Sequence, residues 1–180
     1  FSKVITFNLD EYLGLTQDHE QSYRYFMEDN LFKHININAS NINFLRGDCS
    51  DAEAHCRKYE EKIRQSGGID LEILGMGHNG HIGFNEPGAP FDGITRCVDL
   101  TESTVRANAR FFEKLDDVPR KALSMGIKTI MRARKIILIV TGRAKAEMVH
   151  KALFGRITAD VPASVLQLHP NVWVLLDKEA

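Results

Sequence analysis

Apolar and polar residues follow one another along the chain in blocks that predict strands and helices in turn. Apolar runs rich in β-formers predict strands, most of them buried, at Val4–Leu9, Ile69–Gly77, Ala122–Gly126, Lys135–Gly142 and Val172–Asp177. Apolar residues at helical spacing, with caps and glycines at the ends, predict helices at Ser22–Ile35, Asp51–Gln65, Thr101–Phe112 and Ala144–Phe154. Mostly apolar strands that alternate with helices are typical of a parallel sheet covered on both faces. We therefore predict an α/β, doubly wound, mostly parallel sheet in three Rossmann-like layers.

Three of the predicted strands end in residues that could contact a ligand. Asp10 and Glu11 follow the first strand, the glycine-rich segment Gly75–Gly88 follows the second, and Lys145 lies shortly after the strand Lys135–Gly142. Ligands of open α/β sheets bind outside the carboxyl ends of the strands. These residues would converge only if their three strands are close in the sheet.

Composition narrows the class of protein. The chain of 180 residues is 43% hydrophobic with a formal net charge of -1, which suits one globular domain and gives no basic bias toward nucleic acid or membranes. No apolar run approaches the roughly 18 residues of a membrane span. Cys49, Cys56 and Cys97 have no metal-binding spacing and indicate free thiols in a reducing cytoplasm. Because Phe1 stands almost at the start of a predicted strand, we expect residues 1–180 to be a single domain that is incomplete at its N-terminus.

The segment GMGHNGHIGFNEPG, residues 75–88, carries the most chemistry in the sequence. Its glycines permit positive φ angles and a close approach of a ligand to the backbone. His81 can move protons near neutral pH, and Glu86 can orient or charge-stabilise its imidazole. Asn79 cannot exchange protons, but its amide can hold a ring or a hydroxyl in place.

Three other interpretations of this segment remain open. A glycine-rich turn with a surface histidine is about equally compatible with the spacing. His78 and His81 could ligate zinc, but no third ligand stands at a familiar distance. GMGHNG also has the G-x-G-x-x-G spacing of a dinucleotide-binding loop, but Phe84–Pro87 interrupt the helix that this loop should open.

Asp10 and Glu11 are two adjacent acids. A partly buried carboxylate at such a position can act as a general base toward a carbon-bound proton, whereas a helix cap or a solvated turn is the commoner reason for an acid there.

Arg110 and Lys145 are candidate phosphate ligands, one a planar fork of donors and the other a point charge. Most of the 23 basic residues are expected on the solvated surface, and Arg106 and Arg143 compete for the two roles.

Several segments together resemble one family. FNLDEYLGL (7–15), QSYRYFM (21–27), GMGHNGHIGFNEPG (75–88) and RANARFF (106–112) are similar to glucosamine-6-phosphate deaminases. The likeness runs in order over essentially the whole chain, and the glycine-rich loop followed by Phe-Asn-Glu-Pro is its most specific part. The related 6-phosphogluconolactonases share the fold and a similar loop, but continue with a different sequence.

The resemblance implies that D-glucosamine 6-phosphate and water are converted to D-fructose 6-phosphate and ammonia, with no metal or organic cofactor. Asp10 matches the base that moves a proton from C2 to C1, and His81 matches the residue that assists ring opening. Asn79 and Glu86 match the residues that support this histidine. Arg110 and Lys145 match the side chains that grip the substrate phosphate. A small-molecule amino-sugar phosphate is then the partner, and a homo-oligomer is the expected state.

The chain departs from the family pattern in two respects. Asn79 stands where many members have aspartate, so that this position can only orient its neighbours. The glycine- and threonine/serine-rich N-terminal loop that cradles the phosphate in the family is not in this sequence.

Two alternative functions belong to different classes. A 6-phosphogluconolactonase-like hydrolase would use His81 to activate water and would not need Asp10 as a carbon base. A non-catalytic sugar-phosphate sensing domain would share the fold, but such regulators carry a DNA-binding segment that this sequence does not show.

Overall fold

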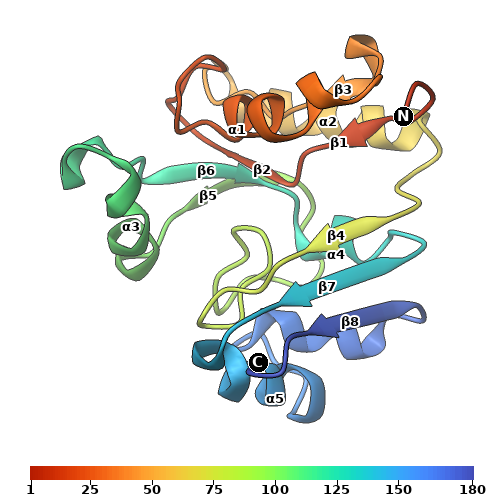
Figure 1. Cartoon of the computed structure of the whole chain (residues 1–180), viewed down its shortest axis with the longest axis vertical. Helices are drawn as coiled ribbons and strands as arrows, with labels where there is room; N and C mark the ends of the chain where they lie inside the picture. Colours follow the sequence, from red (N-terminus) through yellow and green to blue (C-terminus); the bar gives the residue numbers. More distant parts are fainter. The chain divides into compact units, whose positions relative to one another are not determined.

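The structure, a computed structural model, describes all residues from Phe1 to Ala180 and divides into two compact units (Figure 1). The first unit comprises residues 1–59 and 96–124, and the second comprises residues 60–95 and 125–180. The division falls inside helix α2 (Ala52–Gln65), so that this helix contributes residues to both units. No helix combines the length and the apolar character needed to cross a membrane.

The first unit contains two small sheets. One is the parallel pair of β1 (Thr6–Phe7) and β3 (Ile42–Asn43). The other has the order β2-β6-β5 and is antiparallel throughout; its strands are β2 (Asp10–Tyr12), β5 (Arg96–Asp99) and β6 (Lys121–Ser124). In this sheet Asp10 lies opposite Ser124, and Ser124 lies opposite Arg96.

The helices of the first unit begin where the sequence supplies a cap. Ser22 accepts a hydrogen bond from the backbone N–H of Tyr25 and caps α1 (Tyr23–Asn30). Thr101 caps α3 (Glu102–Asn108) in the same way through the N–H of Thr104.

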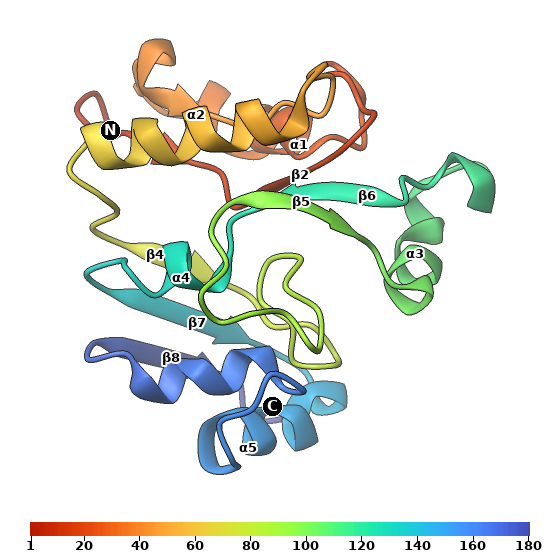
Figure 2. The ribbon, with the colours of Figure 1, turned by 180° about the vertical axis from the view of Figure 1, so that it is seen from behind.

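The second unit is built on a parallel sheet of order β4-β7-β8, with strands β4 (Glu72–Leu74), β7 (Ile136–Val140) and β8 (Val172–Leu176). Helices α4 (Ile127–Ile130) and α5 (Ala146–Phe154) lie on one face of this sheet (Figures 1 and 2). On β7, Ile136, Leu138 and Val140 are buried. Since side chains of a strand alternate between faces, these three form the core under the helices.

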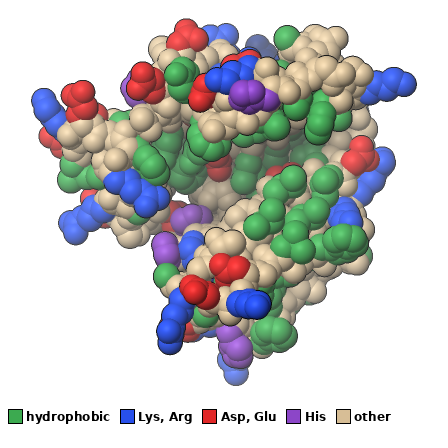
Figure 3. All heavy atoms as spheres, in the orientation of Figure 1, with side chains coloured by type: hydrophobic (Ala, Val, Ile, Leu, Met, Phe, Trp, Pro, Cys, Tyr) green, Lys and Arg blue, Asp and Glu red, His purple; other side chains and the backbone are tan.

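The opposite face of this sheet is apolar and exposed. Ile73, Ile139, Trp173 and Leu175 expose between 43% and 60% of their surface. Hydrophobic side chains gather there over β4, β7 and β8 (Figure 3). The Nζ atom of Lys135 lies 3.2 Å from the ring centroid of Trp173 and covers part of this face.

The α/β class is confirmed, but several local predictions need correction. The strand predicted over Val4–Leu9 shrinks to Thr6–Phe7, and Val4 and Ile5 are more than 40% exposed, because β1 pairs only with the two-residue strand β3. The helix predicted over Ser22–Ile35 ends at Asn30 and continues as a 3-10 turn. Strands β2, β3 and β5 escaped prediction, because each is short and none is a continuous apolar run; Asp10 and Glu11, expected after a strand, lie inside β2.

Candidate active site

The glycine-rich loop follows β4 directly and brings three of the predicted site residues together. The side-chain amide of Asn79 donates to Oε2 of Glu86 at 2.6 Å, and its Oδ1 accepts from the backbone N–H of His81 at 3.2 Å. Nδ1 of His81 lies 3.4 Å from the same Oε2 of Glu86. The loop therefore holds a histidine, an amide and a carboxylate in one cluster, as predicted.

The ring of His81 is positioned by what it packs against. A Cβ atom built on Gly77 would lie 2.2 to 2.4 Å from three atoms of this ring, so that only glycine leaves room for it. Nδ1 of His81 is buried and forms no hydrogen bond in this geometry, although the carboxylate of Glu86 is close. Catalytic hydrogen bonds are often long without substrate, and a small rotation of the ring would close this one.

The glycines of the loop serve different purposes. Gly80 has a φ of +82°, which suits only glycine without strain, whereas Gly75 and Gly77 are not in this region. Of the conformational freedom that these glycines permit, Gly80 therefore uses the positive φ, whereas Gly77 provides room for the ring of His81. No helix follows Gly80; instead Ile82 and Asn85 form an isolated β-bridge, which removes the helix that a dinucleotide-binding loop needs.

Lys145 lies beside the start of the same loop. It follows β7 in a 3-10 turn (Arg143–Lys145), and its ammonium group donates a hydrogen bond to the backbone carbonyl of Met76. Because β4 and β7 are parallel neighbours, their carboxyl ends meet at one edge of the sheet, which fulfils the condition for two of the three predicted strands; the first, β1, pairs with β3 in another sheet. Partial burial lowers the pKa of Lys145.

Asp10 belongs to the first unit, where it begins β2. Its side chain is half-buried, and burial, together with the negative charge of Glu11, raises its pKa to about 7. Tyr12 and Tyr23 stack near it with ring centroids 5.4 Å apart. Burial raises the pKa of Tyr12 to about 12 and raises that of Tyr23 as well, with the charge of Asp10 adding to both effects. These two tyrosines were not predicted from the sequence as neighbours of Asp10. Tyr12 could have been found, because it follows Asp10 by two residues and so lies on the same side of the strand.

Glu11 is a helix cap, which was the commoner of the two interpretations of an acid at this position. Its carboxylate accepts from the backbone N–H groups of Tyr23 and Arg24 at the first turn of α1. It therefore caps a helix, and does not share the exposure of Asp10.

Arg110 also belongs to the first unit and is exposed. It lies in the 3-10 turn after α3, with its guanidinium 4.6 Å from the ring centroid of Phe111. The ring of Phe112 contacts Tyr12 edge to face at 6.2 Å, so that this segment lies alongside β2.

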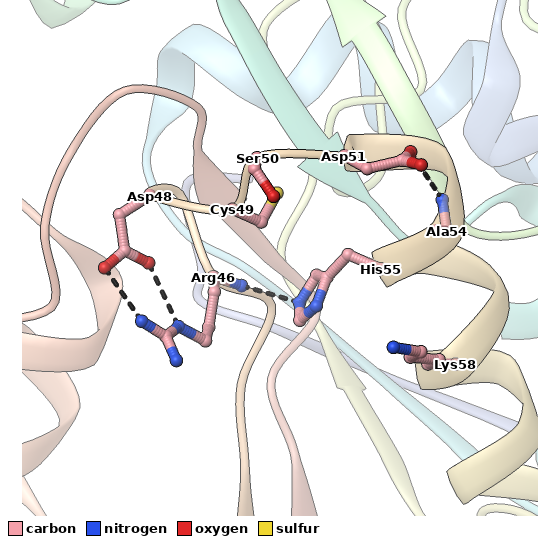
Figure 4. Close-up of a pocket in the computed structure, with 8 residues that line it drawn as sticks. All are labelled: Arg46, Asp48, Cys49, Ser50, Asp51, Ala54, His55 and Lys58. Carbon is pink, nitrogen blue, oxygen red and sulfur yellow. Dashed lines mark hydrogen bonds and ion pairs between the residues drawn. The ribbon is translucent and has the colours of Figure 1, made fainter.

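A cavity of about 360 Å³ in the first unit contains none of the predicted site residues (Figure 4). Its polar groups mainly satisfy one another: Arg46 pairs with Asp48, and Nε2 of His55 accepts from the backbone N–H of Arg46. A second cavity, of about 350 Å³ near Gly67 and Thr129, also contains none of the predicted site residues. No group of three histidine, cysteine or acidic side chains is arranged to hold a metal ion.

Residues 1–174 match the model of the family Glucosamine-6-phosphate isomerases/6-phosphogluconolactonase. The chain belongs to this family. A protein of Thermoanaerobacter pseudethanolicus named glucosamine-6-phosphate deaminase is 55% identical over 180 residues, which are all of this chain and 71% of that protein. A protein of Halothermothrix orenii with the same name is 54% identical over 180 residues, again all of this chain and 75% of that protein.

Two solved structures share the fold of this chain at very different identities. One described as a monomeric glucosamine-6-phosphate deaminase has a TM-score of 0.97 at 48% identity and covers 99% of this chain and 74% of its own. The structure of 6-phosphogluconolactonase from Thermotoga maritima has a TM-score of 0.73 at 20% identity and covers 98% of this chain and 74% of its own. At that identity the second likeness shows a shared fold alone.

Proposed function

We propose that this member of the family is a glucosamine-6-phosphate deaminase, which converts D-glucosamine 6-phosphate and water to D-fructose 6-phosphate and ammonia. The observation that carries the proposal is an identity of 54% to 55% across the whole chain with proteins of that name. The lactonase from Thermotoga maritima, at 20% identity, gives no comparable support to the hydrolase alternative. No feature of the structure favours a sensing domain.

In this proposal His81 opens the sugar ring. It carries the proton of the anomeric hydroxyl to the ring oxygen, which yields the open-chain aldehyde. The contacts of Asn79 with both the backbone of His81 and the carboxylate of Glu86 support a role in orientation. Glu86 stabilises the imidazole when it is protonated, because its Oε2 lies 3.4 Å from Nδ1.

Asp10 then acts as the base of the isomerisation. Its carboxylate removes the proton from C2 of the open sugar and returns it to C1. The aldehyde oxygen gains a proton as the nitrogen loses one, so that C1 becomes a hydroxymethyl group while the C2 amine becomes an imine. Water adds to the imine carbon and ammonia leaves, so that a ketone remains at C2. A pKa of about 7 suits this task, since a base is most effective when its pKa lies near the working pH.

Lys145 and Arg110 are the proposed ligands of the substrate phosphate. Lys145 is half-buried and donates to a backbone carbonyl, and no carboxylate neutralises its charge. Arg110 is exposed, and its guanidinium rests on an aromatic ring, which leaves donors available for a phosphate. Arg110 belongs to the first unit and Lys145 to the second, so the role of each rests only on contacts within its own unit.

The remaining proposals concern the setting of the enzyme. Residues 1–180 act as one catalytic domain that needs no metal or organic cofactor; the single family model that spans both units supports the first statement. A cytoplasmic location is supported by three free cysteines, Cys49, Cys56 and Cys97.

The homo-oligomer expected from the sequence stays a prediction, since a relative at 48% identity is described as a monomer. Light scattering during gel filtration decides between the two states.

Ammonia release from D-glucosamine 6-phosphate tests the proposal. We expect activity in the unaltered chain and a loss of about 100-fold or more in both Asp10→Asn and His81→Ala, since general acid-base groups contribute rate factors of roughly 10² to 10⁴. Circular dichroism of each variant controls for folding. Hydrolysis of 6-phosphogluconolactone that persists in Asp10→Asn, without ammonia release by any form, would overturn the deaminase and favour the lactonase.

A further inference from the structure

Glu11 is a buried acid that the proposed mechanism does not use. It is 2% exposed and stands next to Asp10 on β2. Its Oε1 accepts from the backbone N–H groups of Tyr12 at 2.9 Å and Tyr23 at 3.0 Å, and its Oε2 accepts from that of Arg24 at 3.0 Å. All of these residues belong to the first unit.

These contacts fasten helix α1 to strand β2. The first N–H groups of a helix have no partner within the helix, and α1 has no acidic residue in its first turn. Ser22 satisfies the N–H of Tyr25, and Glu11 satisfies those of Tyr23 and Arg24 from 12 and 13 residues away. The carboxylate thus supplies the negative charge that a helix N-terminus favours.

The same contacts determine what surrounds Asp10. Tyr12 follows Glu11 on the strand, Tyr23 begins the helix, and their rings stack at 5.4 Å with an interplanar angle of 13°. Burial raises the pKa of both tyrosines, and the charge of Asp10 adds to that rise. The backbone N–H groups of both tyrosines donate to the carboxylate of Glu11, which therefore holds the two residues together.

We propose that Glu11 is a positioning residue for Asp10, because its buried carboxylate locks the strand that carries Asp10 to the helix that supplies Tyr23. This inference rests on the proposed function for the assignment of Asp10 as the base. Glu11 does not touch the substrate in this scheme. It fixes the direction of the Asp10 carboxylate, and its negative charge makes Asp10 hold its proton more tightly. Burial raises the pKa of Glu11, and the backbone N–H groups of Tyr23, Arg24 and Tyr12, which donate to its carboxylate, oppose that rise.

Few other charges act on Asp10. Tyr12 and Tyr23 are neutral near pH 7, as tyrosines ordinarily are, and burial raises the pKa of each further. Arg96 stands two strands away in the same row of the sheet, across Ser124, and is half-buried. Glu11 is therefore the charged neighbour whose removal should change the titration of Asp10 most directly.

The test compares Glu11→Gln with Ser22→Ala. Glutamine keeps the volume of the side chain but loses the charge and one of the two acceptor oxygens. Ser22→Ala removes the other cap of the same helix, so that it costs roughly 1 kcal/mol of stability without touching Asp10 or its charge. The Asp10 carboxyl is titrated by carbon-13 NMR without substrate, and ammonia release is measured against pH.

We expect Glu11→Gln to lower the titration midpoint of Asp10, to move the acid limb of the kcat/KM profile to lower pH, and to reduce kcat between about 10- and 100-fold with little change in KM. Ser22→Ala should leave the midpoint, the profile and kcat of the folded enzyme unchanged. Equal losses in both variants with an unshifted midpoint would reduce Glu11 to a structural cap and overturn the proposal.

If Glu11→Gln does not fold, Glu11→Asp decides: it keeps the charge but is too short to reach α1, so a kcat like that of the unaltered enzyme would overturn the proposal. If the unaltered enzyme releases no ammonia, the proposed function fails. The NMR titration still reports whether Glu11 controls Asp10, because it uses no substrate.

Discussion

Replacing Asp10 by asparagine is expected to stabilise the protein while it removes the activity. Burial and the charge of Glu11 raise the pKa of Asp10 from 3.8 to about 7. Between these two values the folded chain keeps the proton that the unfolded chain has lost. The unfolded state then binds fewer protons, and the free energy of unfolding falls as the pH rises through this window. Asparagine has nearly the same shape and never ionises, so this loss is absent in the variant.

The size of the effect follows from the shift. The difference of 3.2 between 3.8 and about 7 corresponds to at most about 4 kcal/mol above pH 8, since each unit is 1.36 kcal/mol. The part of this loss of stability that corresponds to roughly the first 1.2 pKa units has already occurred at pH 5. About 3 kcal/mol of the loss therefore remains to develop between pH 5 and pH 9. The side chain is only half-buried, and we therefore expect a measured gain between about 1 and 3 kcal/mol over this range.

Urea-induced unfolding of the unaltered chain and of Asp10→Asn at both pH values measures this gain. Asp18→Asn, at an exposed position of the same unit, is the control and should stay within about 0.5 kcal/mol of the unaltered chain at either pH. A stability difference between Asp10→Asn and the unaltered chain that is the same at pH 5 and pH 9 would refute the reasoning. Asp10 would then titrate in the folded protein as it does in the unfolded chain.

Two predictions concern the second unit. Gly77→Ala places a methyl group 2.2 to 2.4 Å from ring atoms of His81, so we expect kcat to fall at least about 10-fold as the ring is displaced, whereas Gly75→Ala, with nothing within 4 Å of the added carbon, should retain most of it. Ammonia release at saturating substrate compares the two, and equal activities would contradict the packing argument. Lys145→Met should raise KM for the sugar phosphate by about 10-fold or more, and Arg143→Met, at an exposed neighbouring position, should change it less than twofold. Steady-state kinetics across substrate concentrations measures both, and a larger effect at Arg143 would exchange the two roles.

Local chemistry could be predicted from the sequence. Asn79, His81 and Glu86 lie within eight residues of one another, so a short loop can bring them together whatever the rest of the fold does. Helix caps are local in the same way, because the hydroxyls of Ser22 and Thr101 each bond within the first turn of their own helix. The alternation of apolar strands and helices likewise gave the α/β class.

Long-range pairing decided the rest. The antiparallel order β2-β6-β5 joins residues more than 100 positions apart, and no short pattern encodes which strand becomes a neighbour. The same holds for Glu11, whose partners at the start of α1 are visible only once helix and strand have met.

The chemical identity of the base and its strength therefore have different origins. The sequence alone places an aspartate at residue 10, next to a second acid, and puts a histidine, an amide and a carboxylate on one glycine-rich loop. Only the tertiary structure buries Asp10 enough to raise its pKa to about 7, because desolvation depends on side chains that packing brings from elsewhere in the chain.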